Sequence, residues 1–137
     1  MFTIAVCDDD MQERMQEVQI VKNIFSQKEL EAGIEEFQTG QHFLDVLHRV
    51  PYDIVLLDIQ MGEVSGFTLA EELYKITGGE NIIFVSSMEN LVFESIHFRP
   101  FRFVRKSHLE EELTEAVESW IQQNTKTECL EFDETGG

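Results

Sequence analysis

The sequence predicts an α/β protein in which five β-strands and five helices alternate along a single domain. Short apolar runs recur five times, and each is followed by a segment whose apolar residues have helical spacing. This alternation is typical of a doubly wound parallel sheet with right-handed crossovers and helices on both faces. A chain of 137 residues is long enough to form one such domain with a core of its own.

The apolar runs are the predicted strands, and they cover residues 2–7, 34–37, 53–58, 82–85 and 101–105. The third contains the continuous aliphatic run 54–57, which is typical of a strand buried on both faces, and it ends in Asp58. An unpaired carboxylate is costly inside such a strand. Asp58 is therefore expected at the carboxyl end of the strand, where an open α/β sheet forms its binding crevice. Residues 34–37 are the expected edge strand.

Polar caps and helix breakers bound the predicted helices. The first helix follows Asp10, which forms a capping-box pattern with Glu13. Met11 and Met15 belong to its apolar stripe and are expected in the core. The other helices are expected from 39 or 40 to 50, from 65 to 77, over 89–97, and from Ser107, which begins a second capping-box pattern. From residue 124 the chain turns polar, which predicts a linker or tail in place of a packed element.

Polar side chains follow four of the predicted strands. Asp8 and Asp9 follow the first, Asp58 the third, Ser86 the fourth and Lys106 the fifth. Parallel strands bring these ends to one edge of the sheet. Clustered carboxylates favour a hard divalent cation such as Mg²⁺, and a hydroxyl beside an ammonium could hold a phosphoryl group. Each residue alone has a simpler explanation, such as a helix cap or a solvated strand end, so the interpretation depends on the whole set.

Charge and cysteine content narrow the class of protein. The chain has 10 Lys and Arg residues against 27 Asp and Glu, a formal charge of −17. This balance disfavours DNA binding by this fragment and association with anionic membranes, since both need basic surfaces. No signal peptide is visible, and the two cysteines do not form a paired framework. A cytoplasmic protein is therefore expected.

These residues, in this order, resemble the receiver domain of bacterial two-component response regulators. The matching segments are 6–9, 53–61 with Gly66, 85–87 and 103–106. Segments 4–10 and 101–108 look like the subset joined to a LytTR-type DNA-binding domain. The resemblance implies a flavodoxin-like (β/α)5 fold with strand order 2-1-3-4-5. It also implies a receiver domain over residues 1–123, with 124–137 as a polar linker toward an absent output domain.

The resemblance also assigns roles to the residues of the predicted site. Asp58 would accept a phosphoryl group from a sensor histidine kinase, and Ser86 and Lys106 would bind its oxygens. Mg²⁺ would be held by Asp58 and three further ligands: Asp8, Asp9 and the backbone carbonyl of Gln60. Movement of Ser86 and rotation of Phe103 would then switch the face formed by helix 89–97, strand 101–105 and the last helix. Such a switch would regulate transcription through the output domain.

A basic cluster lies on the same face. Arg99, Arg102, Arg105 and Lys106 fall within eight positions. The resemblance allows a homodimer through this face, and we expect the arginines to pair with acids of the last helix, such as Glu111 or Glu115, in a second copy. Ordinary salt bridges on a solvated strand are the alternative.

Two residues depart from the family pattern, and two alternative functions remain possible from the sequence. Ser107 and Gly62 stand where the family usually has proline, so a cis peptide after Lys106 is not expected and the loop after Met61 is expected to be more mobile. A phosphate-independent interaction module is one alternative function. A Mg²⁺-dependent phosphohydrolase is a weaker one, because Gln60 stands where such enzymes place a general acid.

Overall fold

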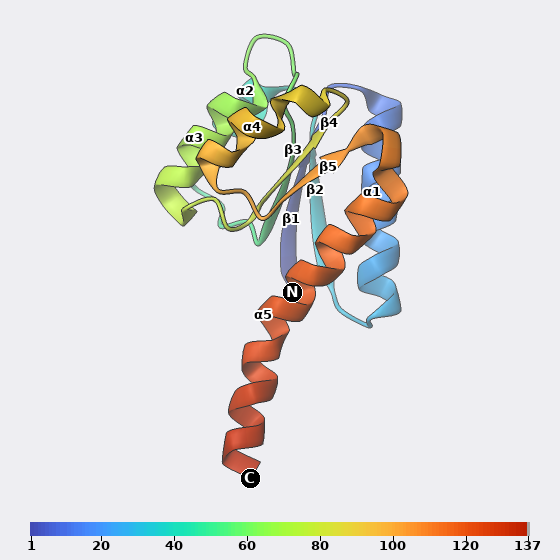
Figure 1. The fold of residues 1–137 in the computed structure, drawn as a ribbon, viewed down its shortest axis with the longest axis vertical. Helices are drawn as coiled ribbons and strands as arrows, with labels where there is room; N and C mark the ends of the chain where they lie inside the picture. Colours follow the sequence, from blue (N-terminus) through green and yellow to red (C-terminus); the bar gives the residue numbers. More distant parts are fainter. Residues whose placement is uncertain (137) are drawn as a thin grey trace.

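The computed structural model describes residues 1–136 and confirms the doubly wound α/β fold. Five parallel strands form one sheet in the order β2-β1-β3-β4-β5 (Figure 1). The strands are β1 (Phe2–Cys7), β2 (Ala32–Phe37), β3 (Ile54–Asp58), β4 (Ile82–Ser86) and β5 (Arg102–Arg105). The segment expected as an edge strand is at the edge, and Asp58 is the last residue of β3, as predicted.

Five α-helices connect and follow these strands: α1 (Met11–Gln27), α2 (Gly40–Leu44), α3 (Gly66–Thr77), α4 (Val92–Ser95) and α5 (Leu109–Gly136). The predicted caps of the first three are present. Asp10, Thr39 and Ser65 each accept a hydrogen bond from the backbone N–H three residues later, which satisfies one of the free donors of the helix start. Gly78 ends α3 in the left-handed conformation, with φ +77°.

Three helical segments differ from expectation. The second is shorter, because α2 ends at Leu44 and turns follow it. The weakly patterned segment 89–97 is a one-turn α4 between two 3-10 turns, Glu89–Leu91 and Ile96–Phe98. The last helix continues to Gly136, so the residues expected as a polar linker or tail are helical (Figure 1). Residues 124–135 contain no glycine or proline, so polar composition alone does not end the helix there.

The start of the last helix also differs. A 3-10 turn, Lys106–His108, precedes α5, and the Oγ of Ser107 lies 2.9 Å from Nδ1 of His108. Among the described hydrogen bonds, none joins Ser107 to Glu110, so the second capping box is not formed.

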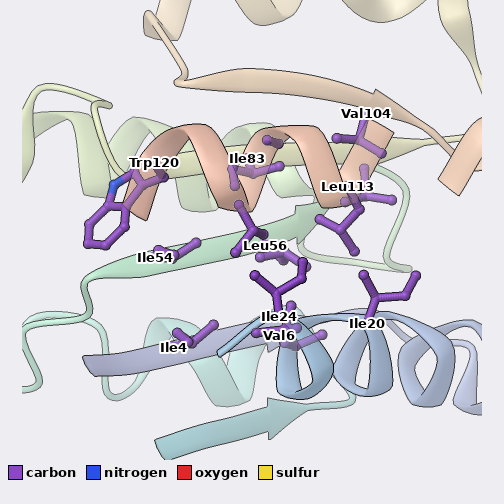
Figure 2. Close-up of a cluster of buried hydrophobic side chains, with 14 of the residues drawn as sticks. Ile4, Val6, Ile20, Ile24, Ile54, Leu56, Ile83, Val104, Leu113 and Trp120 are labelled. Atoms are coloured by element: carbon purple, nitrogen blue, oxygen red, sulfur yellow. The ribbon is translucent and has the colours of Figure 1, made fainter. Parts of the chain in front are cut away.

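Two apolar layers cover the two faces of the sheet. On one face α1 and α5 pack over β1, β3 and β4 (Figure 2), with a core that includes Ile4, Val6, Ile24, Leu56, Ile83 and Leu113. The other layer lies under α2 and α3 and includes Phe43, Leu57, Leu69 and Phe84. Truncating one such buried leucine to alanine typically costs about 2–5 kcal/mol. This packing holds the carboxyl ends of the strands in fixed positions along one edge.

The apolar stripe of α1 was assigned incorrectly at its start. Met11 and Met15 are exposed, whereas Glu17, Ile20 and Ile24 are buried. With 3.6 residues per turn, the buried stripe is centred between Glu17 and Val21, so Met11 lies about a quarter of a turn and Met15 more than about a third of a turn from its centre. A carboxylate in the middle of the stripe conceals it from a search for apolar periodicity.

Across the described residues, no helix combines the length with the apolar character that crossing a bilayer requires.

Candidate functional site

Two carboxylates come together where β1 and β3 end. Cys7 pairs with Leu57 in the register of these neighbouring strands, so Asp8 and Asp58 both follow that pair. Asp8 is completely buried and Asp58 is 5% exposed. The sheet therefore holds two ionisable groups side by side with little access to water.

Lys106, which follows the carboxyl end of β5, places its positively charged ammonium group beside these carboxylates. Its Nζ donates a hydrogen bond to Oδ2 of Asp58 at 3.2 Å and lies 3.2 Å from Oδ2 of Asp8. Burial lowers the pKa of Lys106, but its contacts with Glu13, Asp58 and Asp8 outweigh that effect and leave the pKa above its ordinary value. The ammonium therefore stays charged at neutral pH and partly neutralises the carboxylates.

Glu13 is a third carboxylate at the site, and the sequence interpretation missed this role. It was assigned to the capping box of α1, yet its side chain bonds Nζ of Lys106. Only half of the capping box is formed. The side chain of Asp10 accepts a hydrogen bond from the backbone N–H of Glu13, but the backbone N–H of Asp10 donates to Oδ1 of Asp8 and not to Glu13. The available signal was an acid in the first helical turn after the Asp8 strand end.

The environment of Asp58 makes it unusually easy to protonate. Burial raises the pKa of Asp58 to about 7; Lys106 lowers it and the charge of Asp8 raises it. Its Oδ1 accepts a hydrogen bond from the backbone N–H of Gln60 at 3.2 Å. One oxygen of Asp58 thus faces Lys106 and the other is held by the loop after the strand.

Glu17 is a further buried acid, directly behind Asp8. Burial raises its pKa to about 10, and both a hydrogen bond to Asp8 and the charge of Asp8 add to the effect. Glu17 is therefore protonated at neutral pH. Oε2 of Glu17 and Oδ2 of Asp8 are both buried without another hydrogen-bond partner, so a proton on Glu17 would provide the missing donor.

The other predicted site residues lie nearby but outside this cluster. Asp9 is exposed and lines a pocket of about 300 Å³ with Met61 and Gly62. Ser86 is buried at the end of β4, and its Oγ accepts a hydrogen bond from the N–H of Met88 at 3.0 Å. Phe103 is half-buried and lines a different pocket, of about 340 Å³, beside β5.

The loop after Asp58 is shaped by two glycines. Gly66 packs so closely that a Cβ there would lie 2.4 Å from the backbone oxygen of Asp58. Gly62 adopts φ +63°, a conformation that disfavours other residues, and has open space around it. The Lys106–Ser107 peptide bond is trans, as the serine predicts.

The arginines near β5 pair with the last helix of their own chain. Nε of Arg102 lies 3.2 Å from Oε1 of Glu115, and Nε of Arg105 lies 2.8 Å from Oε2 of Glu112. Arg102 thus has an acid of the last helix as its partner within its own chain, as the alternative of ordinary salt bridges predicts.

The cluster has the chemistry of a divalent-cation site. Asp8, Glu13 and Asp58 each offer a carboxylate oxygen, and these atoms lie within 4.8 Å of one another. Oδ2 of Asp8 is buried, and apart from the carboxyl group of Glu17 it has no hydrogen-bond donor, although Lys106 is close to it. Hard cations such as Mg²⁺ prefer oxygen ligands of this kind. The residues present therefore fit the cation that the sequence predicts.

Comparison with known proteins agrees with the fold. The family model for the response regulator receiver domain matches residues 4–118, most of the chain. The chain therefore belongs to the response regulator receiver domain family, whose members are phosphoacceptor switches in signalling. Membership implies a histidine kinase as the source of the phosphoryl group and an acidic pocket that binds Mg²⁺.

One curated relative shares only a modest part of its sequence with this chain. The sensory transduction protein LytR of Staphylococcus epidermidis is 24% identical over 91 residues, which are 64% of this chain and 36% of that protein. The chain thus spans about a third of this relative's length, and the match is consistent with the LytTR-type subset.

Solved structures show the same fold. Full-length FixJ from B. japonicum has a TM-score of 0.73 at 23% identity over 96% of this chain and 64% of that chain. TrrA from Thermotoga maritima, in complex with Mg²⁺-BeF, has a TM-score of 0.65 at 26% identity over 88% of this chain and 99% of that chain.

Proposed function

We propose that Asp58 accepts a phosphoryl group from a sensor histidine kinase in a Mg²⁺-dependent reaction. The observation that carries this proposal is the position of Asp58, at a strand end and within 3.2 Å of the Lys106 ammonium. Lys106 comes from a strand two places away in the sheet, so the contact is built by the fold as a whole. The chain would act as a switch rather than as an enzyme that turns over a substrate.

The transfer needs an ionised Asp58. A carboxylate oxygen of Asp58 attacks phosphorus, the new P–O bond forms, and the P–N bond to the kinase histidine breaks with its electron pair left on the imidazole. Because the pKa of Asp58 is about 7, much of it is protonated at neutral pH without a cation. Bound Mg²⁺ would neutralise negative charge on the carboxylates and on the transferring group. Lys106 would offer its ammonium to a phosphoryl oxygen.

The ligands of Mg²⁺ proposed from the family resemblance are Asp8, Asp9, Asp58 and the backbone carbonyl of Gln60. Clustering of Asp8 and Asp58 supports two of these assignments. The Mg²⁺-BeF complex of TrrA, a relative of the same fold, supports the cation itself. Asp9 lies at the rim, in the pocket beside Gly62, and would have to turn inward.

Phosphorylation would be transmitted through Ser86 and Phe103. Ser86 ends β4 beside β3, in a sheet where Val85 pairs with Asp58. Its Oγ would leave the N–H of Met88 for a phosphoryl oxygen. Phe103 lies on the next strand, paired with Phe84, and would rotate into the space that results.

The face altered by this switch has apolar side chains that a partner could cover. Phe93 is 80% exposed and Ile96 is also exposed, both on or next to α4. A homodimer through α4, β5 and α5 would bury them, and its formation would be the output of phosphorylation. Residues 124–137 would lead to an output domain of LytTR type, which would bind DNA in place of this acidic, cytoplasmic fragment.

Phosphotransfer from a kinase tests this function. Kinase domains of the source organism, autophosphorylated with labelled ATP, are mixed with the protein in Mg²⁺ or in excess chelator. Label should move to the wild-type chain within minutes for one kinase, only with Mg²⁺, and not to Asp58→Asn. A chain that gains no label from any kinase, but still binds one, would be an interaction module instead.

A further inference from the structure

Glu13 occupies a place in the site that its position in the sequence does not explain. It lies in the first turn of α1, where its carboxylate could have turned back to cap the helix. It reaches instead to Lys106, 93 positions away in the chain. Its ligand oxygen lies within 4.8 Å of those of Asp8 and Asp58, and it closes the cluster on the side of α1.

The charge of the cluster is not balanced by the protein. Lys106 is the one ammonium that contacts Asp8, Glu13 and Asp58 among the described ion pairs, so a single positive charge faces three acidic side chains. The guanidinium of Arg14 donates a hydrogen bond to the backbone carbonyl of Asp8 at 2.8 Å, and its charge is paired with Glu36 at 3.0 Å. A divalent cation would balance this excess of acidic groups.

A second observation points into the same volume. Asp8 is completely buried, and apart from the carboxyl group of Glu17 its Oδ2 has no hydrogen-bond donor, even though Lys106 lies 3.2 Å away. A carboxylate oxygen can accept two hydrogen bonds or bind a metal, so Oδ2 keeps a free acceptor position beside Lys106. Asp9, by contrast, is exposed and lies outside the group of three carboxylates.

We infer that Glu13 supplies a carboxylate oxygen to the divalent cation, together with Asp8 and Asp58. This inference rests on the proposed function, because it adds a ligand to the same Mg²⁺ site. The side chain of Glu13 is 41% exposed, so it can exchange Lys106 for an incoming cation without disturbing the core. Lys106 is then released for the phosphoryl group, and cation binding prepares the site for transfer.

Calorimetric titration of the whole chain with Mg²⁺, repeated with Mn²⁺, tests this inference. Glu13→Gln should weaken binding about tenfold or more, since even outer-shell partners of metal ligands typically contribute that much. Glu13→Asp keeps the charge but shortens the reach, and should weaken binding as well. Glu36→Gln removes the same charge from an exposed acid nearby, and its affinity for the cation should stay within about twofold of the wild type. The melting temperatures of these variants without cation should match that of the wild type.

The outcomes separate the inference from the proposed function. Unchanged or tighter binding in Glu13→Gln would overturn the role of Glu13, as would wild-type affinity in Glu13→Asp, which would mean that only charge matters. Suppose that the wild type binds Mg²⁺, that Asp58→Asn loses this binding and that Glu13→Gln keeps it. The proposed function would then stand, and the inference about Glu13 would be wrong. If the wild type does not bind Mg²⁺, the proposed cation site itself fails.

Discussion

The carboxyl group of Glu17 is buried beside the carboxylate of Asp8, and this environment raises the pKa of Glu17 to about 10. Asp8 therefore lies between Glu17 of α1 and the ammonium group of Lys106. A buried acid that remains neutral can act as a hydrogen-bond donor, which an ionised one cannot. This pair fixes the position of one carboxylate of the proposed cation site.

Substitutions of Glu17 should reveal its role as a donor. Glu17→Gln keeps a donor of similar size, and we expect the free energy of unfolding at pH 7 to change by less than about 1 kcal/mol. Glu17→Met has a similar length but removes the donor that faces Oδ2 of Asp8, which should cost about 1–3 kcal/mol. Urea denaturation of both variants measures the difference. Equal stabilities for the two would argue against the bond.

The raised pKa of Asp58 predicts a pH dependence of stability. Its pKa is about 7 in the folded protein, against about 4 in an unfolded chain. Between these values the folded state binds more protons, so the stability that Asp58 contributes is present at low pH and lost as pH rises through 7. The Asp58→Asn variant has no carboxyl group at this position and does not lose stability in this way. Without divalent cations, its free energy of unfolding minus that of the wild type should rise by roughly 2–4 kcal/mol from pH 4 to pH 8.

The comparison of the two chains removes the effect of titrating groups that do not interact with Asp58. Urea denaturation at several pH values in chelator gives the difference directly. A difference that is constant across this range would mean that Asp58 titrates normally.

Two glycines near Asp58 should respond differently to alanine. At Gly66 the new Cβ would meet the backbone oxygen of Asp58 at 2.4 Å, so the strand end or α3 must shift. We expect a cost of about 1–3 kcal/mol and slower phosphorylation of Asp58. Gly62→Ala meets no atom and should cost only the conformational penalty of about 1–2 kcal/mol, with phosphorylation retained. Thermal denaturation and intact-mass kinetics report the two effects; equal phosphorylation rates in both variants would contradict the steric argument.

Exposed apolar residues near α4 predict where the activated protein self-associates. Phe93→Ser should abolish dimer formation after phosphorylation, since it removes a large exposed ring from the proposed face. Met15→Ser is the matched control, because it removes an exposed apolar side chain from α1. Sedimentation of the phosphorylated chains measures both. A dimer that survives Phe93→Ser, or is lost in Met15→Ser, would place the interface elsewhere.

The fold could be predicted from the sequence because its signals are local and repeated. Each buried strand is a continuous apolar run, and the polar residue that ends it marks one edge of the sheet. Asp8, Asp58 and Lys106 could be brought together by topology alone, since parallel strands share an edge. Their contacts in the structure confirm that reasoning.

Residues on α1 escaped prediction for a different reason. Glu13 fits a local capping pattern, and only the fold shows that Lys106 competes successfully for it. Glu17 is a carboxylate in a buried stripe, which hydrophobic periodicity treats as an interruption. In both cases a long-range contact decides the role of the side chain, and no pattern of neighbouring residues contains it.

The mass of the intact protein after incubation with Mg²⁺ and acetyl phosphate tests the central claim most directly. The wild-type chain should gain the mass of one phosphoryl group, which is lost in mild base, as expected for an acyl phosphate. Asp58→Asn should gain nothing, and neither should the wild type in chelator. An unmodified wild-type chain, or an adduct that persists in Asp58→Asn, would contradict the assignment of Asp58 as the phosphoacceptor.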